Sequence, residues 1–171
     1  MTAAPPHKIA VRPLTAASFA PYGQIVATRK VFGQGVGTHA DPAQDPAEAQ
    51  LVLSAGTPRL WIMHSGAVGT RFRRIARHRR TTQCLGSVDG TEWLVGVAPP
   101  GDLSDSAAPA LDEIVGFRVP AGAIIKLHLA TWHAGPHHTR DEARFLNLEL
   151  MDTNDTDFHA AELGVECVFD V

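Results

Sequence analysis

The segment V-P-A-G-A-I-I-K-L-H-L-A-T-W-H-A-G-P-H-H, residues 119–138, is the part of the sequence that decides the fold. Turn-forming residues lie near both of its ends: Pro120 and Gly122 at the start, Gly135 and Pro136 at the end. Because Gly and Pro interrupt regular structure, these two pairs predict two turns with a short regular element between them.

Apolar and polar residues alternate in the run I-K-L-H-L at residues 125–129. A period of two is typical of a half-buried strand, and it places Lys126 and His128 on one face. The pair Trp132-His133 follows shortly after. Two titratable side chains on one face with a nearby Trp-His pair favour the wall of a pocket. The alternative is a strand with two solvated side chains, followed by a surface loop of histidines.

Similar strand patterns recur along the chain, separated by turn residues. Besides residues 123–129, strands are expected at residues 8–14, 24–28, 59–65, 71–78, 81–88, 91–98, 113–119, 144–151 and 165–171. Short helices are expected at residues 15–19, where Thr15 can act as the N-cap, and at residues 157–163, and a long loop at residues 31–50. Many short strands joined by turns predict a single all-β domain over residues 1–171, a sandwich or barrel, with a flexible N-terminus at residues 1–8.

Two local patterns carry specific expectations about this sheet structure. Leu60, Ile62 and His64 alternate with other residues and are expected to face inward, so that His64 is a satisfied core histidine. Asp89-Gly90 separates two strand patterns, which predicts a two-residue hairpin between them.

Composition narrows the class of protein. The chain has 171 residues, of which 44% are hydrophobic, and no segment approaches the length of a membrane span. The N-terminus lacks the apolar core of an export signal, so a cytoplasmic location is expected. The two cysteines, Cys84 and Cys167, lie too far apart for a close-spaced metal motif, and reduced thiols are expected.

Charge is unevenly distributed along the chain. The net charge is −3, but six arginines fall within residues 71–80, and acidic residues gather after Asp141. The sequence pI of about 6.3 argues against a protein that binds a nucleic-acid backbone. The arginine cluster therefore favours a small carboxylate ligand or pairing with the acidic final third of the chain.

Two segments resemble the two motifs of the cupin superfamily. In the first, H-R-R-T-T-Q-C-L-G-S-V-D-G at residues 78–90, His78 stands where the second histidine of that motif lies and Gln83 where its glutamate lies. Ala76 occupies the position of the first histidine. In the second, the turn at residues 120–122 precedes His128. This resemblance implies a cupin-like double-stranded β-helix, or jelly-roll barrel, with a few short helices.

Within the cupins, the chain resembles the ureidoglycolate lyase (ureidoglycolate hydrolase) family as a divergent member. The resemblance rests on P-L-T-A-A-S-F-A-P-Y-G at residues 13–23, H-R-R-T-T-Q at residues 78–83, the V-G-V-A-P run at residues 95–99 and H-L-A-T-W-H at residues 128–133. It implies a carbon–nitrogen lyase of allantoin and purine catabolism that cleaves ureidoglycolate, or a related carboxylate hemiaminal, to glyoxylate and urea.

The implied chemistry assigns roles to particular residues. A base removes the hydroxyl proton of the hemiaminal and an acid protonates the departing urea. Histidine can do both near neutral pH. His128 and His133 are expected to be the base and the acid, in either order. The expected substrate contacts are Lys126 or an arginine such as Arg73 or Arg80 for the carboxylate, Gln83 for the ureido amide, and Trp132 as an apolar wall.

The cofactor and the wider function stay open at this point. His78, Gln83 and His128 could hold a divalent metal, nickel, zinc or iron, or the same residues could bind the substrate without a metal. The alternatives to a lyase are a non-catalytic small-molecule sensor and a metal-dependent isomerase or dioxygenase. A homodimer is expected, with no nucleic-acid or membrane partner.

Four further residues receive a structural interpretation. His137 and His138 follow Gly-Pro and are expected in a loop, and Cys84 is expected to be a buried structural thiol. Glu149 shares a strand face with Phe145 and Asn147, and that face could reach the pocket or lie on the outside of the sheet.

Overall fold

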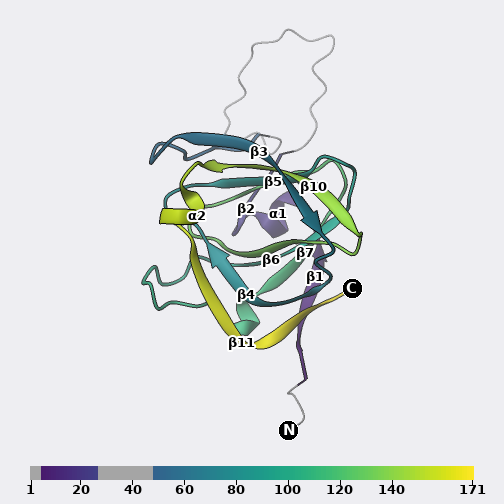
Figure 1. The fold of residues 1–171 in the computed structure, drawn as a ribbon. Helices are drawn as coiled ribbons and strands as arrows, with labels where there is room; N and C mark the ends of the chain where they lie inside the picture. Colours follow the sequence, from purple (N-terminus) through teal and green to yellow (C-terminus); the bar gives the residue numbers. More distant parts are fainter. Residues whose placement is uncertain (1–4, 27–47) are drawn as a thin grey trace.

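The computed structural model describes residues 5–26 and 48–171, and these residues form a two-part β structure (Figure 1). The strands are β1 (His7–Pro13), β2 (Gly23–Val26), β3 (Pro58–Gly66), β4 (Arg71–Arg77), β5 (Gln83–Ser87), β6 (Trp93–Ala98), β7 (Val115–Val119), β8 (Ile124–Leu127), β9 (Trp132–His137), β10 (Glu142–Leu150) and β11 (His159–Asp170). The helices are α1 (Ala16–Phe19), α2 (Thr153–Thr156) and a 3-10 turn at Leu111–Glu113. None of the helices in the described ranges is long and apolar enough to cross a membrane.

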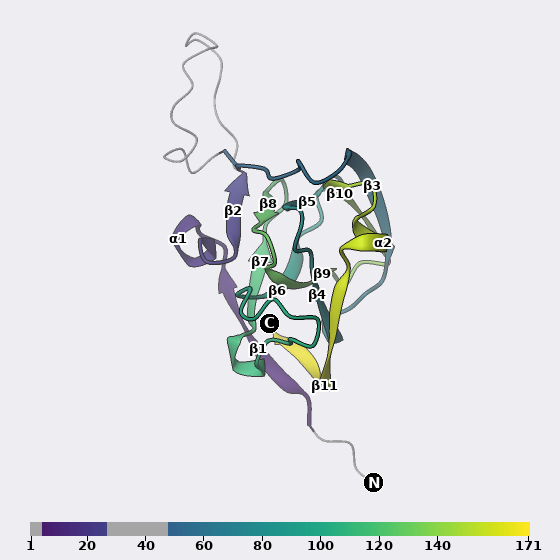
Figure 2. The same ribbon diagram turned by 90° about the vertical axis from the view of Figure 1, so that its left-hand side faces the viewer.

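Two sheets pack on each other. One is a closed barrel in the order β1-β11-β4-β9-β6-β7, and the other is an open sheet in the order β2-β8-β5-β10-β3. In Figure 1 the open sheet lies above the closed one, and Figure 2 shows α1 beside β2 at one edge with β3 at the other. The prediction of an all-β, cupin-like barrel is confirmed.

Each part has its own apolar core. The core between the sheets contains Trp93, Val95 and Val97, which share one face of β6. The core inside the closed sheet contains Ile75 and Trp132 among others. Strand β6 lies between the two cores and presents apolar side chains to both of them, which explains why it is buried along its whole length.

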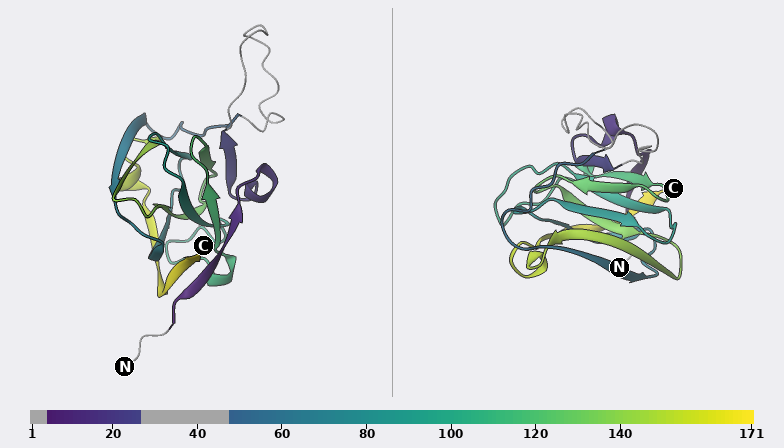
Figure 3. Two further views of the ribbon diagram at one scale, coloured as in Figure 1. Left: turned by 90° about the vertical axis from the view of Figure 1, so that its right-hand side faces the viewer. Right: turned by 90° about the horizontal axis from the view of Figure 1, so that it is seen from above.

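Strand β10 pairs with both β3 and β5, and its alternation decides what enters the core between the sheets. Phe145, Asn147 and Glu149 point inward and are buried, whereas Leu146 and Leu148 face outward. The right-hand view of Figure 3 looks down on the open sheet, where β10 lies beside β3. The question left open for Glu149 is therefore settled in favour of the interior.

The expected facing of β3 is wrong. Leu60 and Ile62 point away from the core with 64% and 51% of their surface exposed, and exposed His64 pairs with Glu142 across 2.9 Å. Trp61 and other residues of the alternate set face inward because they pair across with the inward set of β10. The period of two was right, but it does not specify which set is buried.

The hairpin expected at Asp89-Gly90 is also wrong. The strands before and after this turn do not pair, because β5 lies in the open sheet and β6 in the closed one. The turn carries the chain from one sheet to the other, and Gly90 supplies the positive φ of 79° that it needs. Hydrogen bonds from Thr91 and Arg144 fix the Asp89 carboxylate and lower its pKa.

The structure differs from the sequence expectations in two further segments. Residues 132–137 form strand β9, although Gly135 and Pro136 were expected in a turn and the next two residues in a loop, and His137 and His138 are buried. The helix expected at residues 157–163 is wrong, because the short α2 precedes it and β11 begins at His159. Antiparallel pairing with β4 supplies the backbone hydrogen bonds of that part of β11.

The N-terminal part matches its signals closely. The Thr15 hydroxyl caps α1 by accepting a hydrogen bond from the Ser18 backbone N–H, and the Ser18 hydroxyl accepts one from the Thr15 backbone N–H. His7 and Lys8, expected to be flexible, already belong to β1. The loop expected at residues 31–50 lies almost entirely outside the described residues.

Candidate active site

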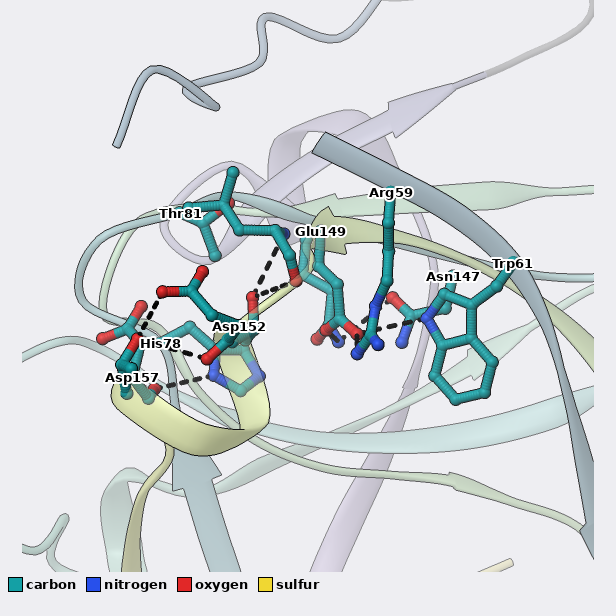
Figure 4. Close-up of polar contacts among 12 residues, drawn as sticks. Arg59, Trp61, His78, Thr81, Asn147, Glu149, Asp152 and Asp157 are labelled. Carbon is teal, nitrogen blue, oxygen red and sulfur yellow. Dashed lines mark hydrogen bonds and ion pairs between the residues drawn. The ribbon is translucent and has the colours of Figure 1, made fainter. Parts of the chain in front are cut away.

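Five strand ends meet at one end of the core between the sheets. The chain leaves β4 at His78, enters β5 at Gln83 and passes His133 at the start of β9. Glu149 lies near the end of β10, and its cross-strand partner Arg59 near the start of β3. We call this end the His78 end, and Figure 4 shows His78, Glu149 and Arg59 in a close-up.

His78 and His133 form a pair of imidazoles with ring centroids 5.1 Å apart. Nδ1 of His78 lies 3.0 Å from the backbone oxygen of Asp157, and Nδ1 of His133 lies 3.1 Å from that of Thr131. A carbonyl oxygen can only accept, so in both rings Nδ1–H is the donor. Both Nε2 atoms are left as proton acceptors.

Burial keeps His133 neutral. Loss of water around the ring, reinforced by nearby His78, lowers the pKa of His133 to about 3. The ring therefore stays uncharged at physiological pH, where its Nε2 can accept a hydrogen bond. The lowered pKa argues against both proton-transfer roles that the sequence left open for His133, base and acid, and favours the role of a hydrogen-bond acceptor.

The lowered pKa of His133 predicts sensitivity to acid. The folded protein keeps the ring neutral down to about pH 3, whereas an unperturbed histidine binds a proton near pH 6.5. Since the unfolded chain then binds more protons, this contribution to stability is complete above pH 6.5 and is lost as the pH falls toward 3. We expect His133→Gln to flatten the dependence of unfolding free energy on pH in that window, by up to about 1.4 kcal/mol per pH unit. Equal slopes for the two proteins in denaturant titrations contradict it.

Asp157 holds His78 in place. Its carboxylate accepts the backbone N–H groups of Arg79 and Arg80, both at 2.8 Å, while its backbone oxygen accepts from His78. The labelled Asp157 and His78 lie together in Figure 4. Because one residue fixes both the chain after His78 and the ring itself, Asp157 is a positioning residue.

Glu149 organises the other half of the site. This fully buried carboxylate accepts from Arg59 at 2.7 Å, from Nε1 of Trp61 at 3.2 Å and from Nε2 of Gln83 at 3.0 Å. Gln83 Nε2 also lies 3.2 Å from Oδ1 of Asn147. A buried charge is tolerated when it is paired and hydrogen-bonded, as here.

Two polar atoms around Glu149 have no partner in the part of the chain that the structure describes. They are Nε of Arg59, a donor, and Oε1 of Gln83, an acceptor. Both are buried, and each side chain is fixed by a hydrogen bond to Glu149. Most buried polar groups find partners, so this complementary pair indicates a ligand that offers both an acceptor and an N–H donor.

The structure places Lys126 and His128 away from this end. They share a face, as the alternation predicts, and Nζ of Lys126 lies 2.8 Å from Nδ1 of His128. That face is the outer one, because Leu127 points into the core beside Gln83 while Lys126 pairs across with Cys84. Neither His128 nor Lys126 joins His78 and His133.

The remaining expected contacts are dispersed. Trp132 lies in the core of the closed sheet beneath Arg77, whose guanidinium carbon is 4.2 Å from the ring centroid. Arg73 is exposed and pairs with Glu166, and Arg80 binds Thr156 and its neighbours. Among the expected substrate contacts, Gln83 alone lies in the Glu149 network.

The donor set does not fit a resident metal. His128 is on the other face of the sheet, so the expected set of His78, Gln83 and His128 does not converge. Within residues 5–26 and 48–171, no three His, Cys, Asp or Glu side chains cluster as metal ligands. The nearest carboxylate, Glu149, is already bound to three side chains. Two imidazoles and an amide oxygen alone form a weak set for a divalent ion.

Sequence reasoning missed Arg59, Asp157 and the pairing of His133 with His78. A turn at residues 128–131 directly precedes His133, and there Ala130 adopts a φ of 61°, which non-glycine residues rarely do and which an alanine in the sequence does not signal. Ala130 N–H donates to the backbone oxygen of His78 at 2.7 Å, which joins the two histidine segments. For Arg59, no local pattern points to a distant glutamate.

The fold and the paired histidines at one barrel end define a cupin-like protein with a candidate small-molecule site. The family model for ureidoglycolate lyase matches residues 6–167, and the chain belongs to that family. A comparison with curated proteins finds no match.

Proposed function

We propose that the protein is a lyase that cleaves ureidoglycolate to glyoxylate and urea at the His78 end of the barrel. The observation that carries this proposal is the complementary pair of unpartnered atoms, Arg59 Nε and Gln83 Oε1, at the same end of the barrel as the imidazoles of His78 and His133. Family membership supports the reaction class.

The binding half of the site suits the two polar ends of the substrate. Arg59 donates from Nε–H to the carboxylate, in keeping with the preference of guanidinium groups for such anions. Gln83 accepts a ureido N–H through Oε1. Glu149 keeps both side chains in position, since it binds Arg59 through Oε1 and Gln83 through Oε2.

The chemical half moves a single proton. Nε2 of a histidine takes the proton of the substrate hydroxyl, the carbon–oxygen double bond forms, and the carbon–nitrogen bond breaks with its electrons on nitrogen. The same imidazole then returns the proton to that nitrogen, which gives urea. His78 is assigned this transfer because His133, with its pKa near 3, holds a proton poorly. His133 accepts a hydrogen bond from the hydroxyl and orients it.

A coupled assay for glyoxylate tests the proposal. Purified protein is expected to release glyoxylate from ureidoglycolate. Gln83→Met, which keeps the length of the side chain but removes its amide oxygen and nitrogen, is expected to lower kcat/KM at least about tenfold. Binding of ureidoglycolate without turnover by the wild-type protein contradicts the lyase and supports the sensor alternative.

The proposed reaction needs no metal, because the residues around the substrate supply both the proton transfer and the charge pairing. Dialysis against a chelator is expected to leave turnover unchanged. Metal content of the purified protein serves as the control. Loss of activity on chelation, with recovery on addition of nickel, zinc or iron, contradicts this part of the proposal.

We also propose a homodimer formed through the outer face of the open sheet at β3. This strand is the last in its sheet, and exposed Leu60 and Ile62 pair across with Leu148 and Leu146 to form an apolar patch. Exposed apolar patches of this kind mark protein–protein interfaces. In a dimer with two-fold symmetry the same patch of each copy packs against that of the other, so the β3 patch can contact its own equivalent.

Light scattering measures this assembly directly. The double substitution Leu60→Lys and Ile62→Lys is expected to turn the dimer into a monomer, since it places charges in the contact. Leu103→Lys, at another exposed leucine, is the matched control and leaves the mass unchanged. A wild-type monomer, or a dimer that survives the double substitution, rules out this interface.

A further inference from the structure

A cavity of about 260 Å³ lies at the opposite end of the core between the sheets, far along β6 and β9 from the His78 end. Trp93, at the start of β6, and His137 and His138, at the end of β9, line it. One water occupies roughly 30 Å³, so the cavity can take a small molecule. None of its lining residues has a part in the proposed reaction.

Two side chains of this cavity carry buried polar atoms without a partner among the described residues. They are Nε1 of Trp93 and Nδ1 of His138, on side chains that are 1% and 3% exposed. Both rings pack against Phe145, with centroid distances of 5.5 Å for Trp93 and 5.7 Å for His138. The two unpartnered atoms therefore belong to rings that flank one phenyl group.

The hydrogen bonds of Ser65 fix what His138 can offer. The Ser65 hydroxyl donates to the backbone oxygen of Gly66 at 3.0 Å, so its oxygen must accept from Nε2–H of His138, 3.1 Å away. Nδ1 of a neutral His138 is then an acceptor. Nε1–H of Trp93 is a donor, so the two buried rings that line the cavity carry one unmet donor and one unmet acceptor.

The surroundings favour a ligand without charge. Arg118 is paired with Glu92 across 2.8 Å at the rim of the cavity, so its positive charge is balanced. His137 donates from Nδ1 to the backbone oxygen of Gly69, and burial lowers its pKa, which keeps the ring neutral. An anion would find no free cation among these lining residues.

We propose that this cavity is a second binding site, for a small neutral amide such as a carboxamide or a urea. The carbonyl of such a molecule accepts from Trp93 Nε1–H, and its N–H donates to Nδ1 of His138. Both unmet atoms are then satisfied by the two adjacent polar groups of one ligand. The site does not depend on the proposed reaction.

Indole N–H resonances in nitrogen-15 spectra test this site directly. The chain has three tryptophans, and they report different places: Trp93 the cavity, Trp61 the Glu149 network, and Trp132 the core of the closed sheet. Trp93→Phe assigns the Trp93 signal. Acetamide and N-methylurea are expected to shift that signal saturably in the millimolar range, as suits ligands of so few atoms, and to leave Trp132 unmoved. A Trp61 shift reports the catalytic end separately.

Matched probes and a variant define the chemistry. N,N-dimethylacetamide lacks an N–H, so it should bind Trp93's cavity more weakly than acetamide. His138→Phe keeps a ring against Phe145 but removes the acceptor, and should weaken acetamide at least about tenfold; unchanged Trp61 and Trp132 signals show that it is folded. No saturable Trp93 shift, meaning that only water enters, overturns the proposal, as does an equal response to acetate.

Discussion

Replacing His78 by alanine is expected to lower kcat on ureidoglycolate by at least about a hundredfold, the usual contribution of a positioned acid or base. Replacing His133 by alanine is expected to lower it at least about tenfold, because the substrate hydroxyl loses the hydrogen bond that orients it. The physical reason is that a backbone carbonyl holds Nδ1 of each ring, which leaves Nε2 of the neutral ring as an acceptor at the same barrel end. Initial rates of glyoxylate release, followed across the pH range in which the protein stays folded, measure the effect.

His128→Ala is the matched control for these two substitutions. It removes a third, partly buried imidazole, but one on the outer face of the open sheet, where it bonds to Lys126 and to the backbone of Ala20. We expect kcat close to that of the wild type. The opposite pattern, a large loss with His128→Ala and little loss with His78→Ala or His133→Ala, rules out the assigned site.

Replacing Glu149 by alanine is expected to destabilise the protein by about 3–5 kcal/mol, the cost of breaking a buried ion pair on one side. The substitution removes the carboxylate oxygen that accepts from Arg59 and Trp61. It also removes the second carboxylate oxygen, which accepts from Nε2 of Gln83. Chemical denaturation of the purified variant gives the free energy of unfolding.

Glu142→Ala, on the same strand, provides the comparison. Glu142 pairs with His64 and Arg144 at the exposed start of β10, and exposed ion pairs contribute about 0–1 kcal/mol. If the two alanine variants unfold at similar denaturant concentrations, Glu149 does not organise the interior. If Glu149→Ala stays folded, its KM for ureidoglycolate should rise, because Arg59 and Gln83 lose their common anchor.

Much of the strand structure could be predicted from alternation and turns. The period of two at residues 125–129 and 144–151 identified β8 and β10, and Thr15 marked the start of α1. Alternation alone could not assign faces, because it is unchanged when the buried and exposed sets are exchanged. Leu60, exposed although apolar, shows the consequence.

The site was predicted only in part for the same reason. His78 and Gln83 could be predicted as site residues because the segment at residues 78–90 resembles a known motif, and both residues lie at the His78 end. Lys126 and His128 do share a face, but pairing with β5 and β2 turns that face outward. Arg59 and Glu149 meet through the register of β3 with β10, a long-range property that no local pattern encodes.

The central claim is that this barrel end breaks the carbon–nitrogen bond of ureidoglycolate by moving one proton from oxygen to nitrogen. The direct measurement is the amount of urea, glyoxylate and ammonia released during complete turnover by the purified protein. The account predicts urea and glyoxylate in equal amounts with no ammonia. Release of ammonia in place of urea, or no release of glyoxylate, contradicts it.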